Sequence, residues 1–491
     1  MNINAVIDML NKEFGTSIDG SYYACIAEWR DWWAGKFKPF HEFREWSGDG
    51  ETGKLITREL YSMRMGKKVC EDWASILLNE KTEIVVDDEA SSLFLQGEDG
   101  MGGVIGANDF WQNGNALIER SFATGTGAAV LRVQNMAVTK RGDVVPDAGA
   151  HIALEYMDAL HIIPITVRRG KVVDVAFVSE VLEHGKHFIY LETHVLEGGR
   201  YRICNRYYAE DEGALRPAEL PEGMSPEIIL PADVPMFALV SPHISNNVET
   251  RPVGLGLSVL ANAVDQLKGV DLAYNNFNRD FKLGGKKVFL DHSMLQHDRS
   301  GRPITPDDVA QQLFVATGDG DLDADGVKKL IQEYNPTLRV AENRDGVQAQ
   351  LDYLSFKCGF GTKHYQFNGT TVVTATQYTG DKQELVQNAA KHYLSVQRFL
   401  QELVRAILWT GKTFLGAAVN PDVNVTVNFE DGYVIDKESE RERDRQDVRD
   451  GLMQPWEYRV KWYGEAEADA RAILAERKDD DSLMGFGAGD A

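Results

Sequence analysis

Residues 252–290 read PVGLGLSVLANAVDQLKGVDLAYNNFNRDFKLGGKKVFL, and this stretch decides the fold. Its apolar side chains recur at steps of three and four residues, which places them on one face of an α-helix. These side chains belong to Leu260, Ala263, Val264, Leu267, Val270, Tyr274, Phe277 and Phe281. Glycines flank the stripe, so we predict a helix over residues 257–283 that is roughly 40 Å long. An apolar stripe of that length needs a partner, either another segment of the chain or a second copy of it.

Length and charge limit what the chain can do. With 491 residues it exceeds one average domain, so several structural regions are expected. Its net charge of −23 argues against a protein that clamps nucleic acid, because tight binders neutralise phosphates with Lys and Arg. The same charge is compatible with a protein through which DNA slides, since strong adhesion would then be a defect.

The four cysteines are far apart and form no CxxC pair, which indicates reduced, mostly buried thiols rather than a disulfide framework. Residues 1–15 (MNINAVIDMLNKEFG) lack the apolar run of a signal peptide. No run of about 18 apolar residues is present that could span a membrane. We therefore expect a soluble protein made in a cytoplasm, with no membrane partner.

Periodic patterns divide the rest of the chain. Two short amphipathic helices are predicted before residue 50, followed by a long helix over residues 55–79. Period-two segments separated by glycines fill residues 152–208 and predict one antiparallel sheet. Residues 211–252 read as a connecting loop, and a polar insertion occupies residues 291–340. Helical periodicity returns at residues 340–356, 383–409 and 436–450. Separate helical and strand regions of this kind predict an α+β fold.

Residues 256–287, GLSVLANAVDQLKGVDLAYNNFNRDFKLGGKK, resemble the descending stem helix of the portal proteins of tailed bacteriophages, in the family of siphophages and prophages of Gram-positive hosts. The segment VCEDWASILLNEKTEI (residues 69–84) is similar to the family's most recognisable N-terminal segment. FATGTGAAV (residues 122–130) is similar to the helix–turn–strand of the portal body. Further matches to positions that recur in the family lie at residues 26–41, 358–361 and 374–377.

The resemblance implies the portal fold, with a mixed helical and antiparallel-sheet wing, a long-helix stem, a small clip and a C-terminal helical crown. On this chain the wing would be residues 1–255, the stem helix residues 256–284 and the clip residues 285–333. Residues 334–410 would hold the returning stem helix, the tunnel loop and a long wing-spanning helix. Residues 411–491 would form the crown and end in a disordered acidic tail.

The same resemblance implies a function. Portal proteins form a ring of about twelve subunits at one capsid vertex, so we expect a virion protein that is synthesised in the cytoplasm of a bacterial host. The ring would be the channel for packaging and ejection of double-stranded DNA, without sequence-specific contacts. The implied partners are other copies of the chain, the terminase, head-completion or adaptor proteins, and the scaffold or major capsid protein. The terminase consumes the ATP in this family, so the chain itself is not expected to be an enzyme.

A basic cluster is the candidate DNA-channel surface of this acidic chain, and it consists of Arg279, Lys282, Lys286 and Lys287. Cations near a helix C-terminus also favour the helix dipole, which could by itself explain half of them. In a ring, cyclic symmetry would repeat each side chain as a ring of positive charge that contacts phosphates weakly. The resemblance leaves the DNA-contacting loop open between residues 334–343 and residues 359–382.

The sharpest local pattern is an acidic run that resembles the start of an EF-hand Ca²⁺ loop. Asp321, Asp323 and Asp325 occupy positions 1, 3 and 5, between helices predicted at residues 307–316 and 327–334. Position 12 is a glutamine, so the usual bidentate carboxylate is missing. We favour a solvated acidic loop, and a Ca²⁺-binding interaction module built on residues 321–332 is the competing hypothesis.

One partial match to a catalytic motif is present. Gly411-Lys412-Thr413 resembles the end of a phosphate-binding loop, but the earlier glycine of that motif is replaced by Ala406. A predicted helix, not a strand, leads into it, so we interpret it as a helix end; a nucleotide hydrolase using Lys412 remains a minor alternative. No clustered set of metal-ligand or nucleophile residues appears, and no cofactor is expected.

Overall fold

The computed structural model describes most of the chain. The described residues are 3–47, 53–98, 100, 102–138, 144–211, 214–221, 224–291, 296–297, 299, 303–304, 313–316, 331–367, 375–429 and 437–474. The structure is 46% helical and 26% strand, which confirms the α+β prediction. The chain divides into two compact units, Met1–Asn368 with Ala389–Phe429, and Gly369–Asn388 with Glu430–Ala491.

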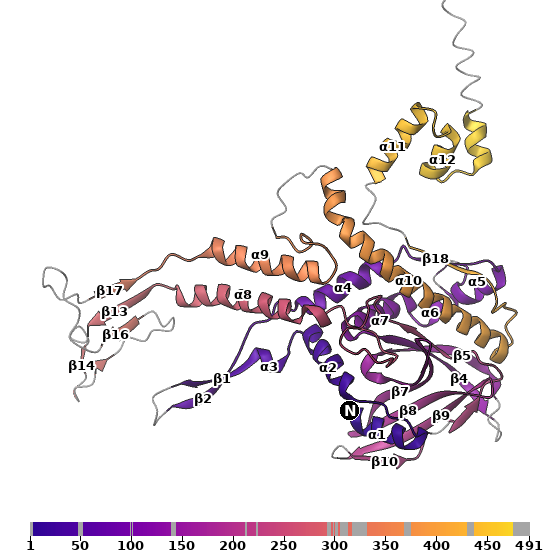
Figure 1. Ribbon diagram of the computed structural model, residues 1–491, viewed down its shortest axis with the longest axis horizontal. Helices are drawn as coiled ribbons and strands as arrows, with labels where there is room; N and C mark the ends of the chain where they lie inside the picture. The colour runs from indigo at the N-terminus through magenta and orange to yellow at the C-terminus, as the bar shows by residue number, and fades with distance from the viewer. Residues whose placement is uncertain are drawn as a thin grey trace, which may run out of the picture. The chain divides into compact units, whose positions relative to one another are not determined.

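The first unit begins with helices and a hairpin (Figure 1). These elements are α1 (Ile3–Phe14), α2 (Ser21–Ala34), α3 (Lys38–His41), β1 (Glu42–Ser47), β2 (Lys54–Glu59) and α4 (Met65–Leu77). The two short N-terminal helices are confirmed. The long helix predicted over residues 55–79 is wrong in its first half, because residues 54–59 pair with β1 in an antiparallel ladder. The helix starts only after Arg64, whose left-handed backbone (φ 53°) makes the turn.

Two sheets form the β part of this unit. The first has the order β12-β4-β5, and the second has the order β10-β9-β8-β7-β6, with β11 paired to β9. Their strands are β4 (Gly127–Val138), β5 (Val144–Asp158), β6 (Ile162–Arg168), β7 (Lys171–Glu183), β8 (Lys186–Glu197), β9 (Arg200–Asp211), β10 (Ala214–Ala218), β11 (Glu227–Ile229) and β12 (Phe237–Val240). The predicted antiparallel meander is right for β6 to β9, but its first segment lies in β5 and pairs with β4 instead. The segment read as a connecting loop also contributes β10, β11 and β12.

A buried ionic network joins the two sheets. Arg132 of β4 donates from Nε to the carboxylate of Glu192 on β8 at 2.9 Å, and His194 and Tyr190 contact the same carboxylate at 2.6 and 2.9 Å. Burial alone would raise the pKa of Glu192, but these partners, Arg132 above all, lower it to about 2. The network therefore holds a charged carboxylate between the sheets.

Helix α7 (Phe110–Thr124) packs on β4 and β5, and it shares an aromatic core with α4 and α10 (Ala375–Phe414). The unit also contains α5 (Glu89–Gln96), α6 (Gly103–Ala107) and the strand pair of β3 (Glu83–Val86) with β18 (Val425–Asn428) (Figure 1). Trp73 of α4 is fully buried, stacks on Phe360 with ring centroids 4.7 Å apart, and contacts Phe122 of α7 and His392 of α10. The helix predicted over residues 383–409 is confirmed and is longer than expected.

The second unit contains α11 (Lys437–Arg449) and α12 (Pro455–Tyr463). They pack through ion pairs and ring contacts: Asp444 accepts from Lys461 at 2.7 Å and from Trp462 at 2.8 Å. A capping box at Gln454 begins α12, in which no side chain is buried. The acidic tail of the sequence analysis lies outside the described residues. Among the helices that the structure describes, none is long and apolar enough to cross a membrane.

Candidate functional site: the α8–α9 hairpin

Helices α8 (Val264–Leu283) and α9 (Val340–Lys357) lie side by side in the first unit, and the chain leaves the body along α8 and returns along α9 (Figure 1). A single 3₁₀ turn, Ala261–Ala263, precedes α8. The helix predicted from residue 257 therefore begins later. Residues 257–260 are held in a non-helical turn because Val259 N–H and Ser258 Oγ both donate to the carbonyl of Phe122.

Two glycines fix the base of α8 on the body. A Cβ on Gly125 would lie 2.5 Å from the carbonyl oxygen of Gly256, and a Cβ on Gly256 would lie 2.4 Å from the carbonyl oxygen of Gly125. The two backbones thus cross in contact, which only glycine permits. Gly256 is also hydrogen bonded on both sides, through its N–H to Thr126 Oγ1 at 2.8 Å and through its carbonyl from Tyr22 at 2.7 Å. The direction in which α8 leaves the body is set by this crossing.

The interface between the helices changes character along its length. Near the body it is apolar and buried, through Leu267 and Val270 on α8 and Leu351 and Leu354 on α9. At the far end it is polar: the Asp280 carboxylate accepts two hydrogen bonds from Arg339, at 2.7 and 3.0 Å, and one from Asn343 at 2.7 Å. The pKa of Asp280 is lowered, chiefly by these hydrogen bonds from Arg339. At its base the α8–α9 hairpin therefore extends the apolar core. Beyond the base, the two helices are joined by polar contacts.

Asp271 is a buried carboxyl group beside the apolar stripe of α8, only 4% exposed. Its carboxylate contacts His41 Nε2 at 2.9 Å and accepts from Met63 N–H at 2.7 Å and from Ser62 Oγ at 3.0 Å. Asn275, one turn further, exchanges hydrogen bonds with the backbone of Tyr61. These contacts, which we call the Asp271 clamp, tie both ends of the β1–β2 hairpin to α8. Periodicity alone does not reveal this clamp; its one signal in the sequence is an aspartate one helical turn from Leu267 of the apolar stripe.

Large apolar side chains remain exposed on the outer flanks of the two helices. They are Leu272 (47%), Phe281 (49%) and Leu283 (47%) on α8, and Tyr353 (61%) and Phe356 (51%) on α9. We call this set the stem flank. Of the three on α8, only Phe281 belongs to the apolar stripe that decided the fold, whereas Leu272 and Leu283 lie on the opposite side of the helix. No described segment buries these five side chains.

The candidate DNA-channel residues cluster in the last turns of α8 and at the start of the next strand. Arg279 and Lys282 are exposed, and neither makes an ion pair with the residues that the structure describes. Lys286 is paired with Glu333 at 3.0 Å, and Lys287 Nζ lies 5.9 Å from the centroid of the Tyr334 ring. The four cations thus differ in their contacts, and Arg279 and Lys282 are the two that are available to bind an anion.

The two candidate DNA-contacting loops are also unequal in structure. Residues 335–339 have no regular secondary structure between a strand and α9, and Arg339 is held by Asp280. In the range 359–382, Phe360 is buried and stacks on His364 at 4.4 Å, while residues 375–382 belong to α10. Within that range, residues 368–374 lie outside the described part of the chain.

A small sheet lies at the far end of the hairpin (Figure 1). It has the order β16-β13-β17, and a second pair, β14 with β15, lies in the same region of the sequence. The strands are β13 (Lys287–Asp291), β14 (Gln296–His297), β15 (Pro303–Ile304), β16 (Leu313–Ala316) and β17 (Ile331–Tyr334). The helices predicted at residues 307–316 and 327–334 are wrong where the structure describes them, because β16 and β17 pair with the two sides of β13.

The predicted cation ligands Asp321, Asp323 and Asp325 lie outside the described residues. Among the residues that are described, no group of three or more His, Cys, Asp or Glu side chains could hold a metal ion. An EF-hand needs a helix on each side of its loop, and the nearest described segments are strands. The Gly411-Lys412-Thr413 match lies in the last turn of α10, where a Cβ on Gly411 would lie 2.6 Å from the ring of Phe94.

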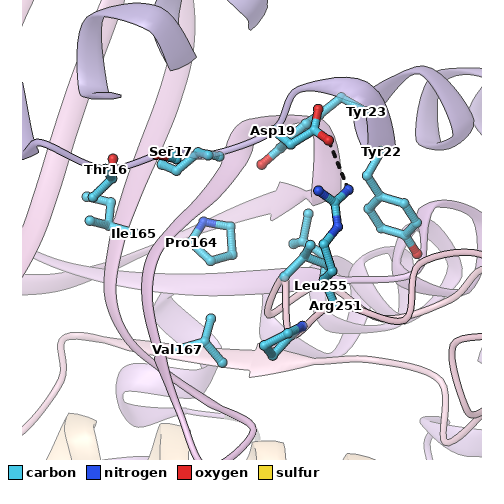
Figure 2. Close-up of a pocket in the computed structure, with 13 residues that line it drawn as sticks. Thr16, Ser17, Asp19, Tyr22, Tyr23, Pro164, Ile165, Val167, Arg251 and Leu255 are labelled. Atoms are coloured by element: carbon cyan, nitrogen blue, oxygen red, sulfur yellow. Dashed lines mark hydrogen bonds and ion pairs between the residues drawn. The ribbon is translucent and has the colours of Figure 1, made fainter. Parts of the chain in front are cut away.

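The described part of the first unit also has a pocket of about 270 Å³ between the start of α2, strand β6 and the loop before α8 (Figure 2). Arg251 lies at this pocket and donates to Asp19 at 2.9 Å, and it also pairs with Glu249. A backbone hydrogen bond from Ser21 and the contact with Arg251 lower the pKa of Asp19 to about 2. The guanidinium is already neutralised by two carboxylates, so the pocket has no strong preference for an anion.

The chain matches no model of a known protein family, and no curated protein is significantly similar to it. A functional proposal for this chain therefore depends on its own residues and their geometry.

Proposed function

We propose that this chain is a bacteriophage portal protein, which assembles as a ring at one capsid vertex and forms the channel for double-stranded DNA. The observation that carries the proposal is the α8–α9 hairpin: two antiparallel helices that leave an α+β body, end in a small sheet, and keep the apolar stem flank exposed. In the portal fold these parts would be the stem, the wing and the clip.

The stem flank supports assembly with other copies. Its five side chains are about half exposed and together leave roughly 500 Å² of apolar surface in contact with water. A standard protein interface buries about 800 Å² on each partner. Because Leu272 and Leu283 lie on the opposite side of α8 from Phe281, the stem flank would contribute part of the contact on each of two sides. When identical copies contact one another through two different surfaces, they form a closed ring if the rotation from one copy to the next is a whole-number fraction of 360°.

The charge distribution supports a conduit rather than a clamp. The chain carries a net charge of −23, and Arg279 and Lys282 are exposed cations at the end of α8. In a ring of about twelve copies each would become a circle of positive charge around the axis. Each phosphate contact adds about 0.9 to the salt dependence of DNA affinity, so a few contacts hold the duplex only loosely.

The proposed partners follow from this role. The terminase would drive DNA through the ring by consuming ATP, while the chain itself would hydrolyse nothing. The sheet of β13, β16 and β17 lies at the far end of the hairpin and exposes Ile331 (52%) and Tyr334 (49%), which suits a docking surface for the terminase, head-completion or adaptor proteins. The body would face the scaffold or the major capsid protein, and the assembled ring would be part of the virion.

Native mass measurement and negative-stain imaging of the purified full chain test the proposal. We expect a closed ring of about twelve copies with a central hole wide enough for a DNA duplex. A chain that stays a single subunit at every concentration, with capsid shells present or absent, would refute it. A steady-state ATPase assay near background is expected for the chain alone, and turnover that is lost in Lys412→Ala would favour a hydrolase instead.

A further inference from the structure

Three consecutive turns in the sheet of β6 to β10 share one backbone conformation. They are the two-residue turns Arg169-Gly170, His184-Gly185 and Gly198-Gly199, which join β6 to β7, β7 to β8 and β8 to β9. Both residues of each turn have positive φ, as a type I′ turn requires. The second and third turns are closed by directly opposed residues of opposite charge, Glu183 with Lys186 and Glu197 with Arg200. Opposite charges that face each other across two strands stabilise a hairpin, so these two turns follow the usual chemistry.

The turn between β6 and β7, residues 168–171, departs from this chemistry, and we call it the basic turn. Arg168 lies directly opposite Lys171, so two like charges close the turn, which is destabilising. Arg169 takes the first left-handed position (φ 52°), where Gly, Asn, Asp and His are found most often. All three cations are exposed, and none makes an ion pair with the residues that the structure describes. A local conflict that nothing in the described chain offsets is typical of a functional element.

A groove next to the basic turn continues this positive surface. It has a volume of about 390 Å³ and is lined by Lys171, by residues 423–425 and by four residues of α10, namely Arg398, Gln401, Glu402 and Arg405. Arg398 and Arg405 are seven residues apart, which places them on one face of α10 and roughly 10 Å apart along its axis. Because Arg168 is opposite Lys171, it lies on the face of the sheet that borders the groove.

Carboxylates neutralise this surface only in part. Glu402 accepts from Arg398 Nε at 2.9 Å, and both terminal nitrogens of that guanidinium have no partner among the described residues. Arg405 lies 3.8 Å from Asp422, whose side chain is 87% exposed, so this pair is weak. A third carboxylate, Asp87, accepts from the one asparagine of the groove at 3.2 Å. The basic turn and the groove therefore carry an excess of cations, in a chain whose net charge is −23.

We propose that the basic turn and its groove bind phosphate groups of duplex DNA, as a second DNA-contacting surface that lies on the body and not on α8. The inference rests on the proposed function, which brings DNA to this chain, and it adds where the body contacts the duplex. All but one of the cations are arginines, and a guanidinium donates two parallel hydrogen bonds to phosphate oxygens. DNA carries one charge per about 1.7 Å of axis, so cations spread over the turn and along α10 contact more than one phosphate at once. Such contacts position the duplex without reading its sequence.

The first test removes the charge of the basic turn. In Arg168→Gln/Arg169→Gly/Lys171→Gln, glycine replaces Arg169 at a left-handed position, so the Tm should equal or exceed that of wild type. Fluorescence anisotropy of a short duplex of random sequence with the full chain should show affinity at least about tenfold weaker at low salt. The salt dependence of that affinity should fall by about 0.9 for each phosphate contact that is lost.

Two further variants of the full chain complete the test. The groove variant Arg398→Gln/Arg405→Gln should weaken DNA binding and reduce its salt dependence in the same way. The matched control His184→Gly/Lys186→Gln changes the neighbouring turn of the same type, where the cation faces Glu183, and should stay within about twofold of wild-type affinity.

The outcomes separate this inference from the proposed function. Wild-type affinity and salt dependence in the turn and groove variants would overturn the second surface, and the proposed function would stand if Arg279→Glu/Lys282→Glu still reduced the salt dependence. If the turn variant instead kept its DNA affinity but weakened the association of copies, the surface would bind a second copy of this acidic chain and not DNA. A wild-type chain that neither assembles nor binds the duplex would overturn both proposals together.

Discussion

Removing the Asp271 carboxylate is the most incisive perturbation of this structure. Asp271 is 4% exposed and accepts from Met63 N–H at 2.7 Å and from Ser62 Oγ at 3.0 Å, beside His41 Nε2 at 2.9 Å. In Asp271→Ala, the amide of Met63 and the ring of His41 would stay buried without an acceptor. Each buried donor left without an acceptor costs about 1–3 kcal/mol, so removing the acceptor of the Met63, Ser62 and His41 donors should cost at least about 3 kcal/mol in total.

Hydrogen exchange of backbone amides measures this loss of local stability at the residues that Asp271 contacts. The peptide that contains Tyr61 and Met63 should exchange about 100-fold faster or more in Asp271→Ala, because about 1.4 kcal/mol is a factor of ten. Asp271→Asn keeps one acceptor oxygen but turns an NH₂ group toward one of the donors, so an intermediate effect of about 1.5–3 kcal/mol is expected.

The matched control lies on the same helix. Asp265 pairs with Lys268 at 3.2 Å but its side chain is 87% exposed, so Asp265→Ala should change stability by no more than about 0.5 kcal/mol. If Asp271→Ala left the exchange of this peptide within a factor of about three of wild type, the Asp271 clamp would contribute little and our account of how the β1–β2 hairpin is held on α8 would be wrong. Equal effects of the two substitutions would refute it as well.

Three other sites give predictions of their own. The pKa of Glu192 is lowered from 4.5 to about 2 in the folded state, so its stabilising effect is present above pH 4.5 and is lost as the pH falls toward 2. Acid unfolding followed by tryptophan fluorescence should therefore be less steep in this range in Glu192→Gln, and an unchanged profile would contradict the network. Gly125→Ala would place a Cβ 2.5 Å from a backbone carbonyl oxygen at φ 92°, and should lower the free energy of unfolding by about 1–3 kcal/mol in thermal melts. Gly185→Ala, at φ 77° with open space around it, is the control and should cost clearly less. Arg279→Glu/Lys282→Glu should leave the mass of the ring unchanged but reduce the salt dependence of DNA binding, by about 0.9 for each phosphate that is no longer neutralised. If the dependence of DNA affinity on salt concentration were unaltered, neither side chain could belong to the channel surface.

Periodicity predicted the long helices well. The stripe through Leu267 and Val270 became α8, and the patterns at residues 340–356 and 383–409 became α9 and α10. A stripe that is buried along one face repeats every three to four residues whatever its partner is, so it is visible before the partner is known. The ends of helices are decided by single contacts, and α8 starts late because Ser258 is held by Phe122.

Contacts between distant segments could not be predicted in this way. Nothing in the local sequence points to a role for His41, because its partner Asp271 is 230 residues away and no local spacing connects them. The helix predicted over residues 55–79 is wrong at residues 55–59, because so short a stretch has no decisive period and its pairing with β1 makes it a strand. The strands at 313–316 and 331–334 depend on β13 in the same manner.

The acidity of the chain constrains how such subunits could associate. Copies that each carry a net charge of −23 repel one another, so a ring must gain more from apolar contact than it loses to this repulsion. The exposed side chains of the stem flank are where that gain is available, and added salt would favour it by screening the charges. DNA held by Arg279 and Lys282 would respond in the opposite sense, because salt weakens phosphate contacts. Apolar contacts would thus hold the ring together, while contacts with phosphates would hold the DNA. The ring would therefore stay closed while the duplex moves through it.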